Sequence, residues 1–311
     1  MNAPETAPAA GGVVPELGEL IALRSLAQAR GRARRGASGL RAQAPSIVRG
    51  RGMEYAESRG YTPGDDARHI DWRVTARRGK PHTKLFQAER ERLSLIVADT
   101  SPALYFGTRV RFKSVQAARA GAVAAWRAVA DGDRVAALRG SPSAPPVPAA
   151  SGARGALRVL DALVRWYARP PADDGGLGLA LEQAQRLLRP GSRLLVLAEP
   201  SSLEAIPDSR WPALAAHHEV VVVLLTDPLE LDPPEALLAF AGAGAAGGDA
   251  VPGRLELDLA APAARARWQA AFGGALADTS ARLAARGVRV VALSCDAPSD
   301  AWLGVPRHGS H

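Results

Sequence analysis

The segment 99–103 places a carboxylate and a hydroxyl two residues apart, directly after the apolar run LSLIVA at 93–98. Asp99 and Ser101 carry oxygen ligands of the kind that a hard cation such as Mg²⁺ prefers. A structural role is the alternative, because Asp and Ser are also common in turns and at helix N-caps. The sequence alone supports the two interpretations about equally.

Other sequence patterns argue against several familiar kinds of site. There is no CxxC, no HExxH and no phosphate-binding GxxxxGK[ST] motif, and His217 and His218 are adjacent, so they cannot face one metal ion as helical histidines at i and i+4 do. Three glycines at 242, 244 and 247 have dinucleotide-motif spacing, but they do not lie between a strand and a helix. Cys295 has no base nearby in sequence, so we expect a small buried residue rather than a nucleophile. We therefore expect no enzyme activity.

The most distinctive segment is 51–92, in which aromatic residues lie among many charges. Its sequence predicts a turn at 63–66, followed by charge-assisted hydrogen bonds, with Trp72 as an apolar anchor. The charged side chains expected in these bonds are Arg68, Asp71 and Arg77. Asp65 and Asp66 are paired carboxylates, but adjacent side chains usually diverge. We therefore favour a polar network that locks an irregular subdomain in place, rather than an acid/base site.

The elements that must position these residues follow from apolar periodicity. After Glu91, short apolar runs alternate with helical patterns, which predicts a mostly parallel sheet with helices on both faces and functional loops at the carboxyl ends of the strands. The predicted strands are 93–98, 134–138, 193–198, 220–225, 255–257 and 288–293. The predicted helices are 111–130, 156–168, 179–188, 234–241 and 261–286, with another helix at 15–32 before the short strands and loops of 42–86.

These elements suggest a division of the chain into four parts. We expect a disordered tail at 1–14, a helix and motif-bearing subdomain with short strands at 15–92, an α/β domain at 93–300 and a second tail at 301–311. Two low-complexity stretches, at 141–155 and 241–253, are predicted to be linkers or insertions.

Charge is concentrated at the start of the chain. Residues 1–92 hold 17 Lys and Arg against 10 Asp and Glu, whereas the remainder holds 22 against 21. The arginines that dominate this block are Arg30, Arg32, Arg34, Arg35, Arg41, Arg49 and Arg51. Such a block could bind nucleic acid through phosphate contacts, although a solvated helix face and loop is at least as well supported and no base-reading motif is present.

The lengths of the apolar runs also bear on location. The longest, such as 219–226, are far shorter than the roughly 20 apolar residues that a membrane-spanning helix needs. The first 20 residues contain acids where a signal peptide has basic residues, and the single cysteine suits a reducing compartment. We therefore expect a cytoplasmic protein that does not insert into the membrane.

The segment 52–77, with the strand and the DTSPA loop that follow, resembles the domain of unknown function 58 family, whose members are often encoded beside MoxR-type AAA+ ATPases. The resemblance is long and specific from residue 50 to about 110 and looser beyond. The matching positions are Gly52, Glu54, Tyr55, Arg59, Tyr61, Pro63, Gly64, Asp65, Asp66, Arg68, Ile70, Asp71, Trp72, Ala76 and Arg77. It implies a von Willebrand factor A-like fold and partnership with a MoxR-type ATPase.

The resemblance also implies a metal-ion-dependent adhesion site, of which this chain keeps only part. Asp99 and Ser101 match the D-x-S-x-S pattern, Ala103 replaces its second Ser, and Leu177 stands where a Thr is expected. Glu199 is the candidate for the late Asp. The loss of two oxygen ligands favours the absence of a bound metal, with Mg²⁺ as the ion that a residual site would take.

Three hypotheses of function follow. The leading one is a non-catalytic adaptor or cochaperone-like protein whose loops at 99–108 engage a partner, the MoxR-type ATPase, in the assembly or maturation of another complex. Nucleic-acid binding through the arginine-rich block is the alternative and is disfavoured. A metal-dependent hydrolase that uses Asp65, Asp66 and Asp99 has the least support, because no nucleophile or general base is identifiable.

Overall fold

A computed structural model describes residues 12–37, 53–62, 65–88, 92–241 and 254–304. By their contacts these residues form two compact units: residues 34–91, here the motif unit, and residues 1–33 with 92–311, here the sheet unit. Helix α1 (Leu17–Ala37) was grouped with the motif subdomain in the sequence-based division. Its apolar residues Leu20, Leu23 and Ala27 are instead buried in the core of the sheet unit, which is why most of the helix belongs there.

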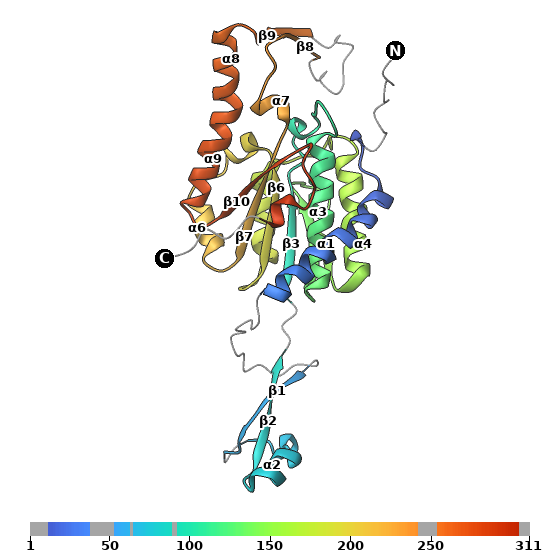
Figure 1. The fold of residues 1–311 in the computed structure, drawn as a ribbon, viewed down its shortest axis with the longest axis vertical. Coiled ribbons are helices and arrows are strands. Elements are labelled where there is room, and N and C mark those ends of the chain that lie inside the picture. The colour runs from blue at the N-terminus through green and yellow to red at the C-terminus, as the bar shows by residue number, and fades with distance from the viewer. Residues whose placement is uncertain (1–11, 38–52, 63–64, 89–91, 242–253, 305–311) are drawn as a thin grey trace. The chain divides into compact units, whose positions relative to one another are not determined.

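The sheet unit is built on six strands in the order β10-β7-β6-β3-β4-β5 (Figure 1). All neighbouring strands are parallel except β5, which runs antiparallel to β4. The strands are β3 (Leu93–Ala98), β4 (Arg134–Arg139), β5 (Val147–Ala150), β6 (Arg193–Ala198), β7 (Glu219–Thr226) and β10 (Arg289–Ser294). The mostly parallel sheet with helices on both faces confirms the expected α/β class and is consistent with the von Willebrand factor A-like fold that the resemblance implies.

Three helices cover one face of the sheet: α1, α3 (Lys113–Ala130) and α4 (Gly152–Tyr167). Helix α3 is rich in alanine, and small residues allow its backbone to approach its neighbours closely. At Gly121 an added Cβ would lie 2.8 Å from a Leu163 methyl carbon of α4. Alternating strand residues such as Ile96 and Leu197 point into this core.

The opposite face is covered by α5 (Gly176–Leu187), α6 (Arg210–Ala215) and α9 (Ala275–Ala284). The intervening strand residues, among them Leu95 and Val196, face these helices. Because β3, β6 and β7 are buried on both faces, each is a nearly continuous apolar run, which is the pattern on which their prediction rested.

One predicted helix is wrong. Residues 234–241 do not form a helix: Leu237–Ala241 is strand β8, which pairs in antiparallel register with β9 (Arg254–Asp258). The centroid of the Phe240 ring lies 5.6 Å from that of the Trp268 ring of the following helical segment. The predicted helix 261–286 is interrupted, since a π-helical turn at Ala270–Gly274 separates α8 (Pro262–Gln269) from α9.

Three stretches predicted as loops or tails contain ordered turns or regular structure. The stretch 141–155 includes β5 and the first turn of α4, so it is not simply a linker. The predicted tail at 301–311 begins with the turn Ala301–Leu303, whose Trp302 is buried in the sheet core. Residues 12–14 of the other predicted tail form a turn, in which the Gly12 carbonyl accepts a hydrogen bond from the Phe112 N–H. Residues 1–11, 242–253 and 305–311 lie outside the described part.

The motif unit contains an antiparallel pair, β1 (Met53–Gly60) and β2 (His82–Ala88), with the helix α2 (Trp72–Arg78) between them. Asp71 caps this helix by accepting hydrogen bonds from the N–H groups of residues 73 and 74. Gly79 ends it in the left-handed region at φ 68°, where a residue without Cβ is unstrained. No helix in the described ranges is both long and apolar enough to cross a membrane.

Candidate functional site

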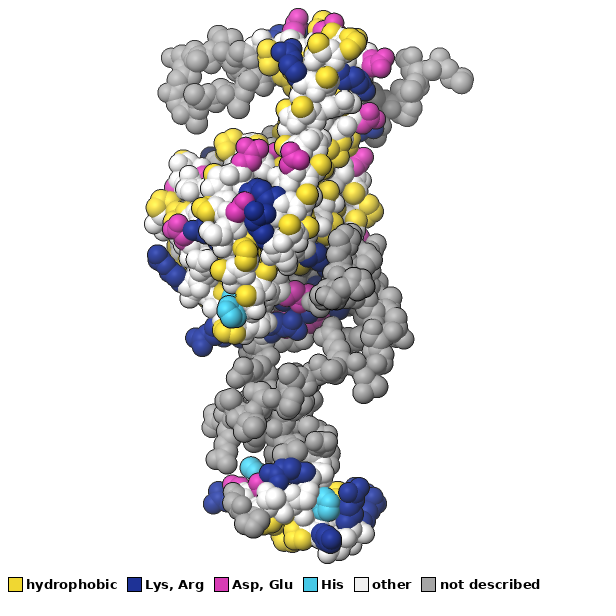
Figure 2. All heavy atoms as spheres, turned by 90° about the vertical axis from the view of Figure 1, so that its left-hand side faces the viewer, with side chains coloured by type: hydrophobic (Ala, Val, Ile, Leu, Met, Phe, Trp, Pro, Cys, Tyr) yellow, Lys and Arg dark blue, Asp and Glu magenta, His cyan; other side chains and the backbone are white. Residues whose placement is uncertain are grey.

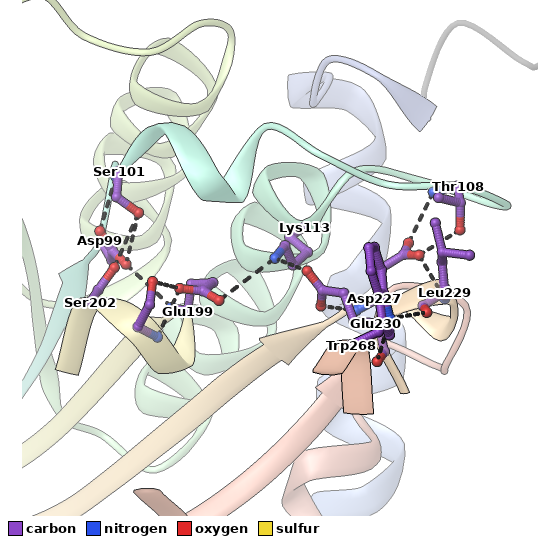
Figure 3. A network of polar contacts seen from close by, with 11 residues as sticks. Asp99, Ser101, Thr108, Lys113, Glu199, Ser202, Asp227, Leu229, Glu230 and Trp268 are labelled. Atoms are coloured by element: carbon purple, nitrogen blue, oxygen red, sulfur yellow. Dashed lines mark hydrogen bonds and ion pairs between the residues drawn. The ribbon is translucent and has the colours of Figure 1, made fainter. Parts of the chain in front are cut away.

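The carboxyl ends of three neighbouring parallel strands bring their acidic residues to one edge of the sheet (Figure 3). Asp99 follows β3, Glu199 follows β6 and Asp227 follows β7. All three side chains are at least nine-tenths buried. Such an edge is where ligands bind in open α/β sheets, so the partners of these carboxylates decide what the site can do.

Asp99 and Ser101 do come together, as the sequence predicted, but their contacts are structural. The Asp99 carboxylate accepts hydrogen bonds from the Ser101 N–H (2.9 Å), the Ser101 hydroxyl (3.3 Å) and the Glu199 N–H (3.2 Å). Ser202 donates its hydroxyl to the Ser101 oxygen at 3.1 Å. Burial raises the pKa of Asp99, and these hydrogen bonds oppose the rise.

Glu199 lies beside Asp99, yet its carboxylate serves other groups. One oxygen accepts hydrogen bonds from the Ser201 N–H (2.8 Å) and the Ser201 hydroxyl, and so caps the turn η4 (Pro200–Leu203). The other lies 3.9 Å from the ammonium nitrogen of Lys113. In Figure 3 the side chain extends toward Lys113. The candidate ligands Asp99, Ser101 and Glu199 thus share an edge but not a common point.

Lys113, which the sequence analysis did not single out, places a buried positive charge beside two carboxylates of this edge. Its side chain is 1% exposed, and its Nζ lies 2.5 Å from Glu230 Oε1. The Phe106 ring centroid is 5.8 Å from the same nitrogen, within cation–π range. Burial raises the pKa of Glu230, while the positive charge of Lys113 works against that rise. Lys113 therefore supplies an internal positive charge to Glu230 and, at longer range, to Glu199.

Asp227 joins the loop after β3 to the end of β7. It accepts hydrogen bonds from the Thr108 N–H (2.9 Å), the Thr108 hydroxyl and the Leu229 N–H (2.9 Å). Its own N–H donates to Glu230, which completes a capping box for α7 (Pro228–Leu231). The Trp268 indole N–H donates to the carbonyls of residues 229 and 230 at 3.1 and 3.2 Å. The network in Figure 3 therefore connects the loop, α7 and α8.

Two positions of the adhesion-site pattern, Ala103 and Leu177, lack an oxygen ligand, and their environments differ from each other. Leu177 is buried in the second core, and Ala103 is exposed. Asp174, three residues before Leu177, accepts a hydrogen bond from the Thr100 hydroxyl at 3.0 Å. Within the described ranges, no group of three or more His, Cys, Asp or Glu side chains is arranged to hold a metal ion.

Within the motif unit the two paired carboxylates diverge. Asp65 binds the Arg59 guanidinium at 2.7 Å and the Thr62 N–H at 3.0 Å, and the Thr62 contact above all lowers its pKa. Asp66 accepts a hydrogen bond from the Arg68 N–H at 3.0 Å and caps the turn Ala67–His69. They therefore do not converge on a shared site, whereas the hydrolase hypothesis requires that they do.

Other motif residues depart from expectation. Trp72 is 71% exposed, so the prediction that it anchors the segment is wrong. Arg68 and Arg77, which were expected in charge-assisted hydrogen bonds, are also exposed. The guanidinium that pairs with Asp65 belongs instead to Arg59. Asp71 is buried, and besides capping α2 it accepts a hydrogen bond from the Ser58 hydroxyl at 3.0 Å. Tyr61 and Ile70 are half-buried, and Ala76 is exposed.

Several predictions fall outside the described part of the chain. Gly52, Pro63 and Gly64 lie there, as do the side chains of Glu54 and Tyr55. So do the side chains of residues 29–37 and all of 38–52, which carry the arginine-rich block. Nucleic-acid binding by that block stays a prediction. Cys295 is 1% exposed, and burial raises the pKa of its thiol.

The comparisons with known proteins cover both units. The family described as "Protein of unknown function DUF58" matches residues 57–272. Uncharacterized proteins of Mycobacterium bovis and of two Mycobacterium tuberculosis strains are each 31% identical over 194 residues, which is 61% of this chain and 60% of theirs. The chain therefore matches about three fifths of the length of these relatives. With more than half of its residues matched, the chain belongs to the DUF58 family of proteins of unknown function.

Proposed function

We propose that this chain is a non-catalytic adaptor that acts in the cytoplasm with a MoxR-type AAA+ ATPase, in the assembly or maturation of another protein complex. The observation that carries the adaptor role is the network at the carboxyl edge of the sheet. Four of its acidic side chains accept contacts from donors within the chain, namely those of Asp99, Glu199, Asp227 and Glu230. Because these carboxylates already have partners within the chain, the edge is better suited to holding a loop in place for a partner protein than to acid/base or metal chemistry. The ATPase partner is inferred from the family resemblance.

The displayed element is the segment 99–112, here the edge loop. Asp99, Thr108 and the start of α3 at Lys113 fix it to the sheet. Four side chains between these anchor points are exposed, while Leu104 is buried: the exposed ones are Pro102, Ala103, Arg109 and Val110, the last at 52%. Well-anchored ends with exposed apolar and basic side chains between them suit a partner-binding surface, because little conformational freedom is lost on binding.

The exposed tip gives a direct test of this role. The double variant Arg109→Glu/Val110→Asp should bind the cognate ATPase at least about tenfold more weakly, as expected when central interface residues are replaced. Isothermal titration calorimetry would measure this with ATP, with ADP and without nucleotide. Arg154→Glu/Leu157→Asp is the matched control, since both residues are exposed on α4. Equal binding by the loop variant, or no association of the unaltered chain in any nucleotide state, would contradict the proposal.

The buried Lys113 at this edge leads to a prediction about the effect of Mg²⁺. Addition of Mg²⁺ or of EDTA should move the melting temperature by less than about 1 °C and leave ATPase binding unchanged when nucleotide is omitted. A site with a dissociation constant of about 0.1 mM would instead gain about 2.7 kcal/mol at about 10 mM Mg²⁺. That gain corresponds to a rise of several degrees in a domain of this size. A shift of that size in differential scanning fluorimetry would show that the edge does bind the ion.

A further inference from the structure

Helix α2 presents an exposed stripe that the described side chains of the motif unit do not cover. At about 100° per residue, Trp72, Ala76, Arg73 and Arg77 lie side by side over less than half of the helix circumference. All four are exposed, whereas Val74 and Thr75 on the other side are half-buried. We name these four residues the α2 stripe. It has an apolar row, Trp72 and Ala76, beside a basic row, Arg73 and Arg77.

The three acidic side chains described in the motif unit are committed to internal contacts. Asp65 pairs with Arg59, Asp66 caps a turn, and Asp71 is buried under the first turn of α2. Residues 58–62 and 65–83 contain six Arg and Lys against three Asp. Figure 2 shows Lys and Arg side chains gathered on the described part of this unit. Among the described side chains of this unit, the exposed charge is therefore mainly basic, and it lies beside one large indole.

We propose that the α2 stripe binds an acidic patch on the ATPase partner, with Trp72 in an apolar recess and the two arginines on carboxylates beside it. This rests on the proposed adaptor function and names a second contact of the same partnership. Both rows find complements on a protein surface, since guanidinium groups bind carboxylates in bidentate geometry and Trp and Arg predominate among interface hot spots. A phosphate backbone would engage only the basic row, and no second exposed aromatic among the described side chains of this unit extends a stacking surface.

The test is the affinity of the full chain for the cognate ATPase. Trp72→Ala should weaken binding at least about tenfold, and Arg73→Glu/Arg77→Glu should weaken it further and remove its dependence on salt. The matched control is Arg154→Glu/Arg158→Glu, which reverses two exposed charges at the same i, i+4 spacing on α4 and should change affinity less than about twofold. All variants should melt within about 2 °C of the unaltered chain, because these side chains are exposed.

The outcomes separate this inference from the adaptor proposal. If the edge-loop variant loses ATPase binding while the stripe variants bind normally, the stripe assignment is overturned and the adaptor stands. If the unaltered chain never associates with the ATPase, both are overturned. A single-stranded DNA oligonucleotide serves as the second probe. Stripe-dependent DNA binding with undisturbed ATPase binding would overturn the acidic-protein assignment in favour of nucleic acid.

Discussion

Lys113→Met is expected to lower the free energy of unfolding by about 3–5 kcal/mol, because it breaks a buried ion pair and leaves the negative partners behind. The Lys113 Nζ lies 2.5 Å from Glu230 and 3.9 Å from Glu199, and its side chain is 1% exposed. Methionine fills much of the same volume, so a cavity contributes little. The loss should come from carboxylates that no longer have a cation in a poorly solvated site.

Urea denaturation at neutral pH measures this effect. Arg165→Met is the control, since Arg165 pairs with Asp161 at 3.0 Å on the surface of α4 and should contribute no more than about 0.5 kcal/mol. Lys113→Met/Glu230→Gln should recover at least about 1 kcal/mol relative to the single variant, because the amide carries no charge and still accepts the Asp227 N–H bond. A loss below about 1 kcal/mol for Lys113→Met would show that the pair does not hold the edge together.

The pH dependence of the same variant has a definite sign. The pKa of Glu230 is already raised from 4.5 by burial, and removal of Lys113 raises it further. A carboxyl group whose pKa is higher in the folded state contributes stability below its unfolded pKa, and loses it as the pH rises through the folded value. The deficit of Lys113→Met should therefore shrink as the pH is lowered from neutrality toward 4.5. A deficit that grows on acidification would contradict this assignment.

Asp227→Ala should have the second large effect, a loss of about 2–4 kcal/mol together with the weakened ATPase binding that the adaptor proposal implies. Asp227 is fully buried and accepts bonds from the Thr108 N–H, the Thr108 hydroxyl and the Leu229 N–H. Hydrogen bonds to a charged acceptor contribute about 1.5–3 kcal/mol each, but Thr108 is exposed and water would replace part of the loss. The edge loop would lose the attachment that orders its tip.

Hydrogen exchange combined with urea denaturation distinguishes this from general unfolding. In Asp227→Ala the Thr108 and Leu229 amides should lose protection while the β3 amides keep theirs, apart from the loss of global stability. Thr108→Val is the milder comparison, because it removes the hydroxyl donor alone and should cost about 1 kcal/mol. Unchanged protection of the Thr108 amide would mean that Asp227 does not hold the loop.

Most strands could be predicted because burial on both faces leaves a continuous apolar run in the sequence. Leu93–Ala98 and Arg193–Ala198 match their predicted bounds for this reason. The run LLAFA at 237–241 is equally apolar but short, and periodicity does not separate a strand from a helix at that length. Its pairing with Arg254–Asp258 decided the outcome, and 12 residues of the chain separate the two strands.

The edge site was only partly visible in the sequence. Asp99 and Ser101 could be found because they directly follow a recognisable strand. Lys113 and Glu230 are 117 residues apart and meet only when β3, β7 and α3 are assembled, and a lysine at a helix start usually points into water. Trp72 shows the opposite error, since its residue type suggested burial and the helix face on which it lies is exposed.

The antiparallel strand β5 has a consequence for how copies of this protein can meet. It lies at one margin of the six-stranded sheet and pairs with β4 at only two positions, Val135 with Ala150 and Ala137 with Val147. Pro148, exposed in its middle, has no N–H to offer an incoming strand. A short margin interrupted by proline resists the strand-by-strand stacking that leads to aggregation and domain swapping. At high cellular concentrations this margin should therefore protect the folded chain from fibrous self-association.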